Sequence, residues 1–467
     1  MKIIIIIVLI TLTLSGFNVF SEESQSILLI SVDTLRHDKI GAYGYMGVYT
    51  PWIDKLVKSG TQFETSLTTV PRTNPSFGSL FTSKKPEVNG VRSLKNTFEP
   101  FNKSMAEILE ENGYYTAAIT SNPLLGEKSG FAQGFQYYYN NPSDFDIMNV
   151  SSDITNKTIE IINQLQDRKF FLWVHYSDPH YPYKPPYPYD ILYIEDQKKL
   201  DNPLNIYEEL KNSGQIKDQL YFFNKLTDNQ KNQIARFYLG TITYTDKEIG
   251  KIIKKIKELK KDKRLVTIFL SDHGESLGEH EYYYEHGDFT YEPELRIPLV
   301  FKTNAKPSIE ITQTNILDIL PTLQHICNLK IDNSLVFDGI SLVNNKGNSK
   351  LTEREFITGE SGLSFYPKNT RRFIGGIETK WRFLRTNRWK LILKPQKDGE
   401  NKIYFEYELY DLLNDPCETM NLYPKQKAEI ENYGKFLIKA YNSDSQSKKE
   451  KVPDELKEKL KSLGYMN

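Results

Sequence analysis

Three short apolar runs, each ending at a polar or ionisable residue, constrain the fold of this chain more than any other feature. The runs cover residues 26–32 (SILLISV), 170–174 (FFLWV) and 265–271 (LVTIFLS). A nearly uninterrupted apolar run of this length predicts a strand that is buried on both faces, as in a parallel sheet. Ligands of such sheets bind beyond the carboxyl ends of the strands. We therefore expect functional side chains where the runs end, at Asp33, His175 and Asp272.

Helical patterns lie between these strands, over residues 51–59, 104–112, 151–166 and 229–260. The alternation of strands and helices predicts an α/β layered fold. After about residue 349 the pattern changes to short strand-like runs separated by turn residues, at 371–374, 381–386, 390–393 and 407–410, followed by a helical pattern over 425–440. This predicts a smaller antiparallel α+β subdomain over residues 350–467.

The first residues have the order of a secretory signal peptide. Lys2 is followed by an apolar run from Ile3 to Leu14 and by small and polar residues through Ser21. This order predicts a signal peptide over residues 1–21 and export to the periplasm or the medium. An uncleaved anchor and a buried strand are the alternatives, although the apolar run is shorter than the ~20 residues that span a bilayer. The catalytic domain is then expected over residues 22–349.

Composition limits the partners and the kind of metal site. Lys+Arg and Asp+Glu both number 60, so no net charge points to nucleic acid or to an anionic membrane. The two cysteines, Cys327 and Cys417, pair or stay free; the sequence leaves both open. Two cysteines cannot build a cysteine-based zinc site, so any metal must be held by carboxylates, histidines and hydroxyls.

Carboxylates at two strand ends predict such a metal site. Asp33 follows the first run, and Asp272 and His273 follow the third. An adjacent Asp and His suit an oxygen and nitrogen ligand set, and Glu275 is expected to orient His273. The alternatives are a helix N-cap for Asp33 and a solvated turn at residues 272–275. Two such strand ends in one chain favour the metal site.

A hydroxyl at a helix N-terminus is the candidate nucleophile. Pro75 suits the first turn of a helix, which places Thr73 and Asn74 at the N-terminus. The helix dipole and the free N–H groups there favour anions. A hydroxyl bound to a cation at this point can ionise and attack phosphorus or sulfur. The alternative is a Thr that only caps the helix.

The histidines cluster along the chain. Of the seven, five lie near the two later strand ends, namely His175, His180, His273, His280 and His286. A protonated or metal-bound His can hold a tetrahedral anion and donate a proton to the leaving oxygen.

Ordered motifs along the chain resemble the sulfatase family of the alkaline phosphatase superfamily. They include SVDTLRHDKIGAYGY (31–45), FLWVHYSDPHYPYKPP (171–186), SDHGESLGEHEYYYEHGDFTYEPELRIPLVF (271–301) and ELYDLLNDPCETMNL (408–422). The resemblance covers nearly all of the chain after residue 21. It implies an alkaline phosphatase-like fold, which is a large, mixed, mostly parallel sheet flanked by helices, and a metal-dependent ester hydrolase.

The resemblance also assigns residues. Asp33, Asp272 and His273 match the ligands of one divalent cation (Ca, Mg, Mn or Zn), and Thr73 matches the nucleophile position and becomes the fourth ligand. His180 and His286 match positions that bind the ester oxyanion or the leaving group. One extra residue separates His286 from Asp272 and His273.

Several positions depart from the family pattern. Typical sulfatases convert a Cys or Ser to formylglycine; Thr73 is not a substrate for that conversion, so no formylglycine is expected. Thr34 stands where many sulfatases have a second metal-binding Asp, and Phe77 replaces an Arg. Ser121-Asn122-Pro123 lies where many carry Lys-Trp-His. The site residues that remain are Asp33, Thr73, Asp272 and His273. This set of one Asp, one Thr and an Asp-His pair is similar to that of phosphodiesterases and phosphoethanolamine transferases of the same superfamily.

The function expected from these residues is hydrolysis of a sulfuric or phosphoric ester through a covalent intermediate on Thr73. The substrate is expected to be a small-molecule, glycan or lipid ester. One alternative is a phosphoethanolamine-type transferase acting on an envelope glycan or lipid, which the lack of apolar spans after the signal peptide disfavours. The other is an inactive, metal-keeping binding protein, which the retention of Asp33, Thr73, Asp272 and His273 together disfavours.

Overall fold

The computed structural model describes residues 25–140, 150–194, 222–223, 225–343, 354–363, 375–423, 425 and 430–444. The expected signal peptide and the expected domain boundary at residues 349/350 lie outside this part of the chain.

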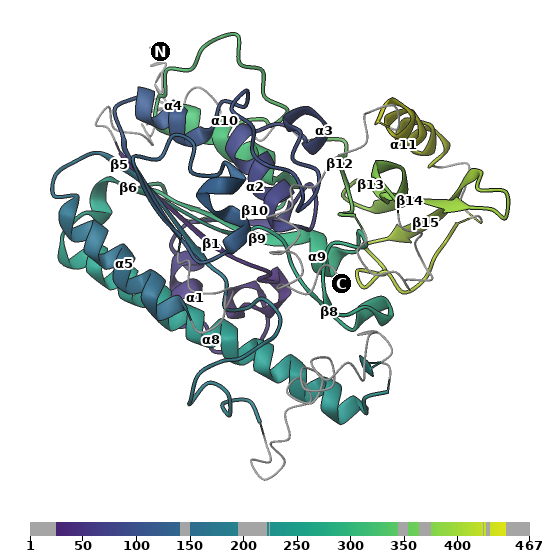
Figure 1. Ribbon diagram of the computed structural model, residues 1–467. Helices are drawn as coiled ribbons and strands as arrows, with labels where there is room; N and C mark the ends of the chain where they lie inside the picture. The colour runs from purple at the N-terminus through teal and green to yellow at the C-terminus, as the bar shows by residue number, and fades with distance from the viewer. Residues whose placement is uncertain are drawn as a thin grey trace, which may run out of the picture.

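A nine-stranded sheet forms the centre of the molecule (Figure 1). Its strands are β1 (Ser26–Val32), β2 (Thr61–Leu67), β3 (Tyr115–Thr120), β4 (Tyr137–Asn140), β5 (Phe170–Tyr176), β6 (Leu265–Ser271), β9 (Arg296–Lys302), β10 (Ser308–Glu310) and β11 (Thr314–Asn315). The order is β10-β2-β9-β6-β1-β5-β3-β4, with β11 beside β2. Only β9 runs antiparallel to its neighbours, β2 and β6. The expectation of a mixed, mostly parallel sheet is therefore confirmed.

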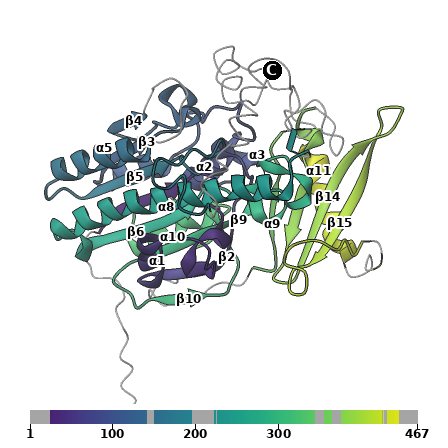
Figure 2. The same ribbon diagram turned by 90° about the horizontal axis from the view of Figure 1, so that it is seen from below.

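Helices cover both faces of this sheet because β1 is apolar on both sides. Its Leu28 and Ile30 pack into one core with α1 (Pro51–Lys58), α5 (Ser151–Gln164) and α8 (Asp228–Glu258). Its Ile27 and Leu29 pack into a second core with α2 (Thr73–Thr82), α4 (Met105–Glu111) and α10 (Ile319–Ile326). Figures 1 and 2 show the two helical layers on opposite faces of the sheet.

The register of the central strands brings their polar ends together. In the parallel pair β1/β6, Val32 lies opposite Ser271, so Asp33 and Asp272 leave the sheet side by side. In the parallel pair β1/β5, Ser31 lies opposite His175. The strand β5 continues two residues beyond the predicted run, because its partners β1 and β3 extend its hydrogen bonding. His175 is thus inside a strand and not just beyond its end.

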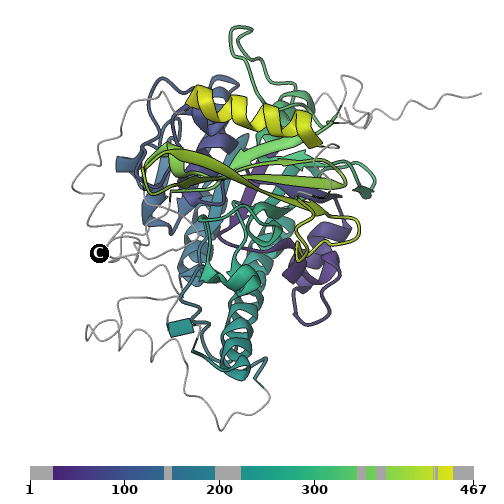
Figure 3. The same ribbon diagram turned by 90° about the vertical axis from the view of Figure 1, so that its right-hand side faces the viewer.

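A second, four-stranded antiparallel sheet follows (Figure 3). Its order is β12 (Ile357–Glu360), β13 (Arg382–Arg385), β14 (Trp389–Lys397) and β15 (Ile403–Asp411). The helix α11 (Glu431–Asp444) lies across it and shares a core with its last three strands. The subdomain prediction missed β12, and its strand at 371–374 lies outside the described residues. Short elements complete the fold, namely α3 (Pro86–Asn89), β7 (Ser276–Leu277), β8 (Tyr283–Glu285) and α9 (Glu292–Leu295).

A buried aromatic core lies between the two sheets. In it, Phe289 and Tyr291, which precede α9, pack with Phe383 of β13 and with Trp381, the residue before that strand. Cys327 and Cys417 are both free thiols. Within the described ranges, none of the helices combines the length and the apolar character needed to cross a membrane.

Candidate active site

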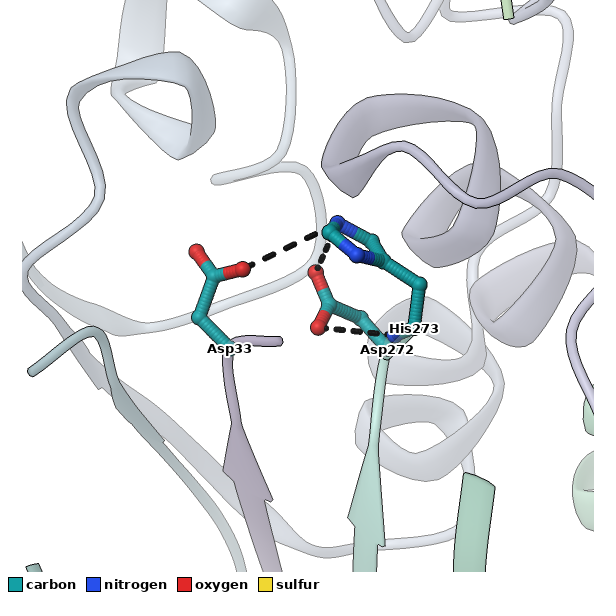
Figure 4. Close-up of side chains that lie close together, drawn as sticks. All are labelled: Asp33, Asp272 and His273. Atoms are coloured by element: carbon teal, nitrogen blue, oxygen red, sulfur yellow. Dashed lines mark hydrogen bonds and ion pairs between the residues drawn. The ribbon is translucent and has the colours of Figure 1, made fainter. Parts of the chain in front are cut away.

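Three oxygen atoms from distant parts of the chain converge on one ring nitrogen of His273. Its Nε2 lies 3.4 Å from Asp272 Oδ2 and 3.7 Å from Asp33 Oδ1. The hydroxyl Oγ1 of Thr73 lies 3.5 Å from the same atom. Figure 4 shows the two carboxylates and the imidazole side by side at the ends of β1 and β6. All four side chains are buried, so the metal ligands and nucleophile expected from the sequence are adjacent.

The hydrogen bonding of His273 prepares Nε2 to bind a cation. Its Nδ1 lies 2.9 Å from the carbonyl oxygen of Gly274. A carbonyl oxygen only accepts hydrogen bonds, so Nδ1 carries the proton and Nε2 presents its lone pair. Burial lowers the pKa of His273 to about 4, against the raising effect of Asp33. The ring is therefore neutral at pH 7, as a metal ligand must be.

Each carboxylate is held by one oxygen and leaves the other without a hydrogen-bond partner in the described structure. Asp33 Oδ2 accepts from Asn122 Nδ2 at 2.8 Å, and Asp272 Oδ1 accepts from the backbone N–H of His273 at 2.9 Å. Asp33 Oδ1 and Asp272 Oδ2 are buried and have no such partner. These are the two oxygens near His273 Nε2. Since unpaired buried carboxylate oxygens are costly, this donor set fits one divalent cation of the kind that oxygen and nitrogen ligands bind.

The charges of the two carboxylates lead to the same conclusion. Burial and the neighbouring Asp33 raise the pKa of Asp272 well above its ordinary value. Burial also acts to raise the pKa of Asp33, but His175, His180 and His273 outweigh it and bring the value to about 2. Two buried carboxylates this close do not both ionise unless a positive charge compensates them. A divalent cation would supply that charge.

Thr73 is the first residue of α2 and does not cap it. The N-cap is Arg72, and no side chain caps this helix. Thr73 is therefore not explained by helix capping, and its hydroxyl faces His273. The neighbouring Ser76 is engaged otherwise, because its Oγ donates to the backbone oxygen of Asp272 at 2.7 Å. The helix-capping interpretation of Asp33 also fails, since the short helix after it (His37–Lys39) is preceded by Arg36.

His180 and His286 line the same site. The ring centroid of His286 lies 4.3 Å from that of His273 and 5.1 Å from that of His180. Glu275 contacts His286, with 3.0 Å between its Oε1 and Nδ1, and not His273 as the sequence led us to expect. The reason is local, because the carbonyl of Gly274 already occupies Nδ1 of His273. His280 stacks on Tyr291 instead, with 3.6 Å between ring centroids.

Three contributors have no specific role that the sequence predicts. A functional side chain is expected at His175, and its Nε2 lies 3.7 Å from Asp33 Oδ2. Asn122 donates to the same oxygen. The one sequence signal for Asn122 is that residues 121–123 differ from the Lys-Trp-His that many sulfatases carry there. Thr34 has a left-handed backbone (φ 55°) and donates its N–H to Asp272 Oδ1 at 3.3 Å. Such backbone strain in a β-branched residue is typical of functional sites.

Comparisons with known proteins identify the family of this chain. A family model described as Sulfatase matches residues 25–328. An arylsulfatase of Clostridium perfringens is 24% identical in an alignment that covers 89% of this chain and 94% of that protein. A Delta 4,5-hexuronate-2-O-sulfatase of Bacteroides thetaiotaomicron is 23% identical in an alignment that covers 91% of this chain and 89% of that protein.

Among solved structures, the phosphonate monoester hydrolase of Agrobacterium radiobacter has a similar fold. The TM-score is 0.71 with 19% identity, and the match covers 90% of this chain and 96% of that one. The family match spans more than half of the chain, and the layered sheet with its C-terminal antiparallel sheet agrees with it. This chain belongs to the sulfatase family of ester hydrolases and has the alkaline phosphatase-like fold of that family.

Proposed function

We propose that this protein is a metal-dependent hydrolase of a sulfuric or phosphoric ester that uses Thr73 as its nucleophile. The observation that carries the proposal is the convergence of Thr73 Oγ1, Asp33 Oδ1 and Asp272 Oδ2 on His273 Nε2, at 3.4–3.7 Å. These four side chains would hold one divalent cation. A cation bound there would lower the pKa of the hydroxyl and neutralise charge on the ester.

Thr73 performs the first step of the proposed reaction. Its Oγ1 forms a bond to phosphorus or sulfur while the bond to the leaving oxygen breaks, in line with the attack. The N-terminus of α2, at which Thr73 lies, favours the anionic group that is transferred. Water then attacks the phosphoryl or sulfuryl group, and the hydroxyl of Thr73 is restored. The methyl group of threonine prevents conversion to an aldehyde hydrate, so breakdown of the covalent ester requires this water.

His180 and His286 are proposed to move the protons. Nδ1 of His180 donates to the backbone oxygen of Tyr181 at 2.5 Å, and Nδ1 of His286 faces Glu275. The protein thus orients Nδ1 of each imidazole. One of the two imidazoles takes the proton of the Thr73 hydroxyl while the other gives a proton to the leaving oxygen; in the second step the first returns its proton to Thr73 Oγ1 and the other takes a proton from the attacking water.

The substrate class follows from the chemistry and from the relatives. Both the hexuronate-2-O-sulfatase and the phosphonate monoester hydrolase are named for esters of tetrahedral acids. We propose that the substrate here is such an ester carried by a small molecule, a glycan or a lipid. An unmodified threonine hydroxyl suits phosphoryl transfer as well as sulfuryl transfer, so both classes must be assayed.

The test is turnover by the purified protein of an aryl sulfate, a phosphate monoester, a phosphodiester and a phosphonate monoester. Each assay is run after chelation and again with Mg²⁺, Ca²⁺, Mn²⁺ or Zn²⁺. We expect turnover of at least one substrate that disappears on chelation and returns with metal. A metal-loaded protein that hydrolyses none of the four would support the inactive binding protein. Transfer of the group to an added glycan or lipid would support the transferase.

We further propose that the protein is exported after removal of residues 1–21, and that the mature chain has a catalytic domain over residues 22–349 and a subdomain over 350–467. The basis for export is Lys2 followed by the apolar run through Leu14. Fractionation of the host with mass spectrometry of the mature N-terminus tests it. A cytoplasmic protein that keeps Met1 contradicts export.

A further inference from the structure

His175 is a buried histidine that the proposed reaction does not use, and its hydrogen bonds define which nitrogen carries the proton. Its Nδ1 lies 3.0 Å from Ser31 Oγ. That hydroxyl oxygen accepts from Trp173 Nε1 at 2.9 Å, because an indole N–H can only donate. The hydrogen of Ser31 is therefore available for His175 Nδ1, which is nearer than the alternative acceptor, the backbone oxygen of Val174 at 3.4 Å. With Nδ1 accepting, the proton of the neutral ring is on Nε2.

The protonated nitrogen faces Asp33. Nε2 of His175 lies 3.7 Å from Asp33 Oδ2 and has no hydrogen-bond partner among the described residues. A buried N–H without an acceptor costs ~1–3 kcal/mol, so the N–H has reason to approach this oxygen. Asn122 Nδ2 donates to the same oxygen at 2.8 Å. Asn122 thus donates to Oδ2, the N–H of His175 faces the same oxygen, and Oδ1 faces His273.

The ring of His175 also packs against α2, the helix that begins with Thr73. Phe77 of α2 contacts it edge-on, with 5.0 Å between ring centroids, and the same Phe77 lies 5.0 Å from Trp173. His175 is therefore held between the sheet and the helix that begins with Thr73. Movement of its ring would disturb Asp33 and α2 together.

We propose that His175 is a positioning residue for Asp33: with Asn122 it ties up Oδ2, directs Oδ1 toward the cation site and so strengthens binding of a divalent cation. Ser31 and Trp173 hold its tautomer and its orientation. This inference rests on the cation site of the proposed function. It assigns His175 no contact with the substrate.

The test is the affinity of the full-length, metal-free protein for Mn²⁺, measured from the electron paramagnetic resonance of free Mn²⁺. The variant His175→Phe keeps an aromatic ring and removes both nitrogens. Loss of a side chain that orients a metal ligand typically weakens metal binding ~10- to 100-fold, and we expect a loss in this range. His175→Gln places an amide N–H near the position of Nε2 and should restore most of the affinity.

A second readout separates positioning from packing. If His175 only packs, His175→Phe should lower the Tm of the metal-free protein and leave the Kd for Mn²⁺ within about twofold of wild type, which would overturn the proposal. If His175 positions Asp33, adding Mn²⁺ should raise the Tm of His175→Phe by less than it raises the Tm of wild type. His175→Gln should recover the gain seen in wild type.

Ser31→Ala keeps the ring of His175 and removes the hydroxyl that selects its tautomer. This variant replaces His175→Phe in the Mn²⁺ measurement if His175→Phe does not fold. It should bind Mn²⁺ more weakly than wild type. An unchanged Kd for a folded Ser31→Ala protein would count against the proposal. A wild-type protein that binds no Mn²⁺ would instead remove the cation site of the proposed function, which is a different failure.

Discussion

At the scale of single residues, Thr73 carries the covalent chemistry that we propose. Thr73→Ala should lower turnover at least ~10³-fold, as when other covalent nucleophiles are removed, and Thr73→Ser should keep part of the activity. Intact-mass measurement after a rapid quench should find the phosphoryl or sulfuryl adduct on Thr73 where breakdown is rate-limiting.

The same helix offers a matched control for this substitution. Thr82 is also a buried threonine of α2, and its hydroxyl donates to the backbone oxygen of Gly78 at 2.7 Å. Thr82→Ala should leave turnover close to that of wild type. Wild-type turnover in Thr73→Ala would mean that another group, such as a metal-bound water, makes the attack.

Asp272 is the residue whose loss should remove the metal. Asp272→Ala deletes one of the proposed oxygen ligands and leaves Asp33, Thr73 and His273, so elemental analysis should find far less bound metal than in wild type. Asp246→Ala is the control, because Asp246 is also buried but accepts from the backbone N–H groups of Trp52 and Ile53 in α1. Equal, stoichiometric metal in wild type and Asp272→Ala would exclude Asp272 from the site.

At the scale of elements, the turn between β8 and α9 places His286 against the start of α2. Gly287 in this turn has φ 91°, and a Cβ atom there would lie 1.9 Å from Nε of Arg72, the residue before Thr73. Gly287→Ala must therefore displace Arg72 or the turn. Because small displacements of catalytic groups slow the reaction strongly, we expect kcat/KM of Gly287→Ala to be ~10- to 100-fold lower than that of wild type.

Gly44→Ala separates this clash from the cost of the backbone conformation. Gly44 has φ 103°, and a Cβ atom there would meet nothing within 4 Å. Both substitutions force alanine into a left-handed conformation, at ~1–2 kcal/mol, but only Gly287→Ala should lower kcat/KM. Equal kinetic effects in the two variants would show that strain, and not the contact with Arg72, is responsible.

At the scale of the whole molecule, a buried ion cluster links the four-stranded sheet to Arg92, which follows α3. Glu360 of β12 accepts from Arg92 Nε at 3.0 Å and from Lys380 Nζ at 2.6 Å. Glu360→Gln leaves two buried cations without their counter-charge, which should destabilise the protein by ~3–5 kcal/mol. Urea denaturation at pH 7 measures this. Glu400→Gln is the control, because Glu400 pairs with Lys402 on the surface, where an ion pair contributes under ~1 kcal/mol.

The same cluster predicts a dependence on pH. Burial acts to raise the pKa of Glu360, but Arg92 and Lys380 hold it well below the ordinary value of 4.5. A carboxyl whose pKa is lowered in the folded state stabilises the protein above the pKa of the unfolded chain, and this stabilisation is lost as the pH falls toward the folded pKa. The stability difference between wild type and Glu360→Gln should therefore be full at pH 7 and shrink below about pH 4.5. A difference that grows toward acid pH would contradict this account.

The sequence by itself determined the strands that build the site and the residues at their ends. The runs 26–32 and 265–271 became β1 and β6 with those bounds, because strands buried on both faces need an uninterrupted apolar sequence. In parallel sheets, ligands bind beyond the carboxyl ends of the strands, and from this rule we expected Asp33, Asp272 and His273 at one site. The three side chains do lie together in the structure. Pro75 likewise marked the start of α2 at Thr73. The apolar runs, the polar residues that end them and Pro75 are all signals carried by residues that are neighbours in the chain.

Only the tertiary structure decided the contacts that orient those residues. Glu275 contacts His286 rather than the nearby His273, and Asp33 is faced by His175 of β5 and by Asn122, which follows β3. Strand order and register set these contacts, since Ser31 lies opposite His175 only because β1 pairs with β5 in this alignment. Residues 31 and 175 are 144 positions apart, and no local pattern encodes which buried polar atoms meet when such distant segments pack.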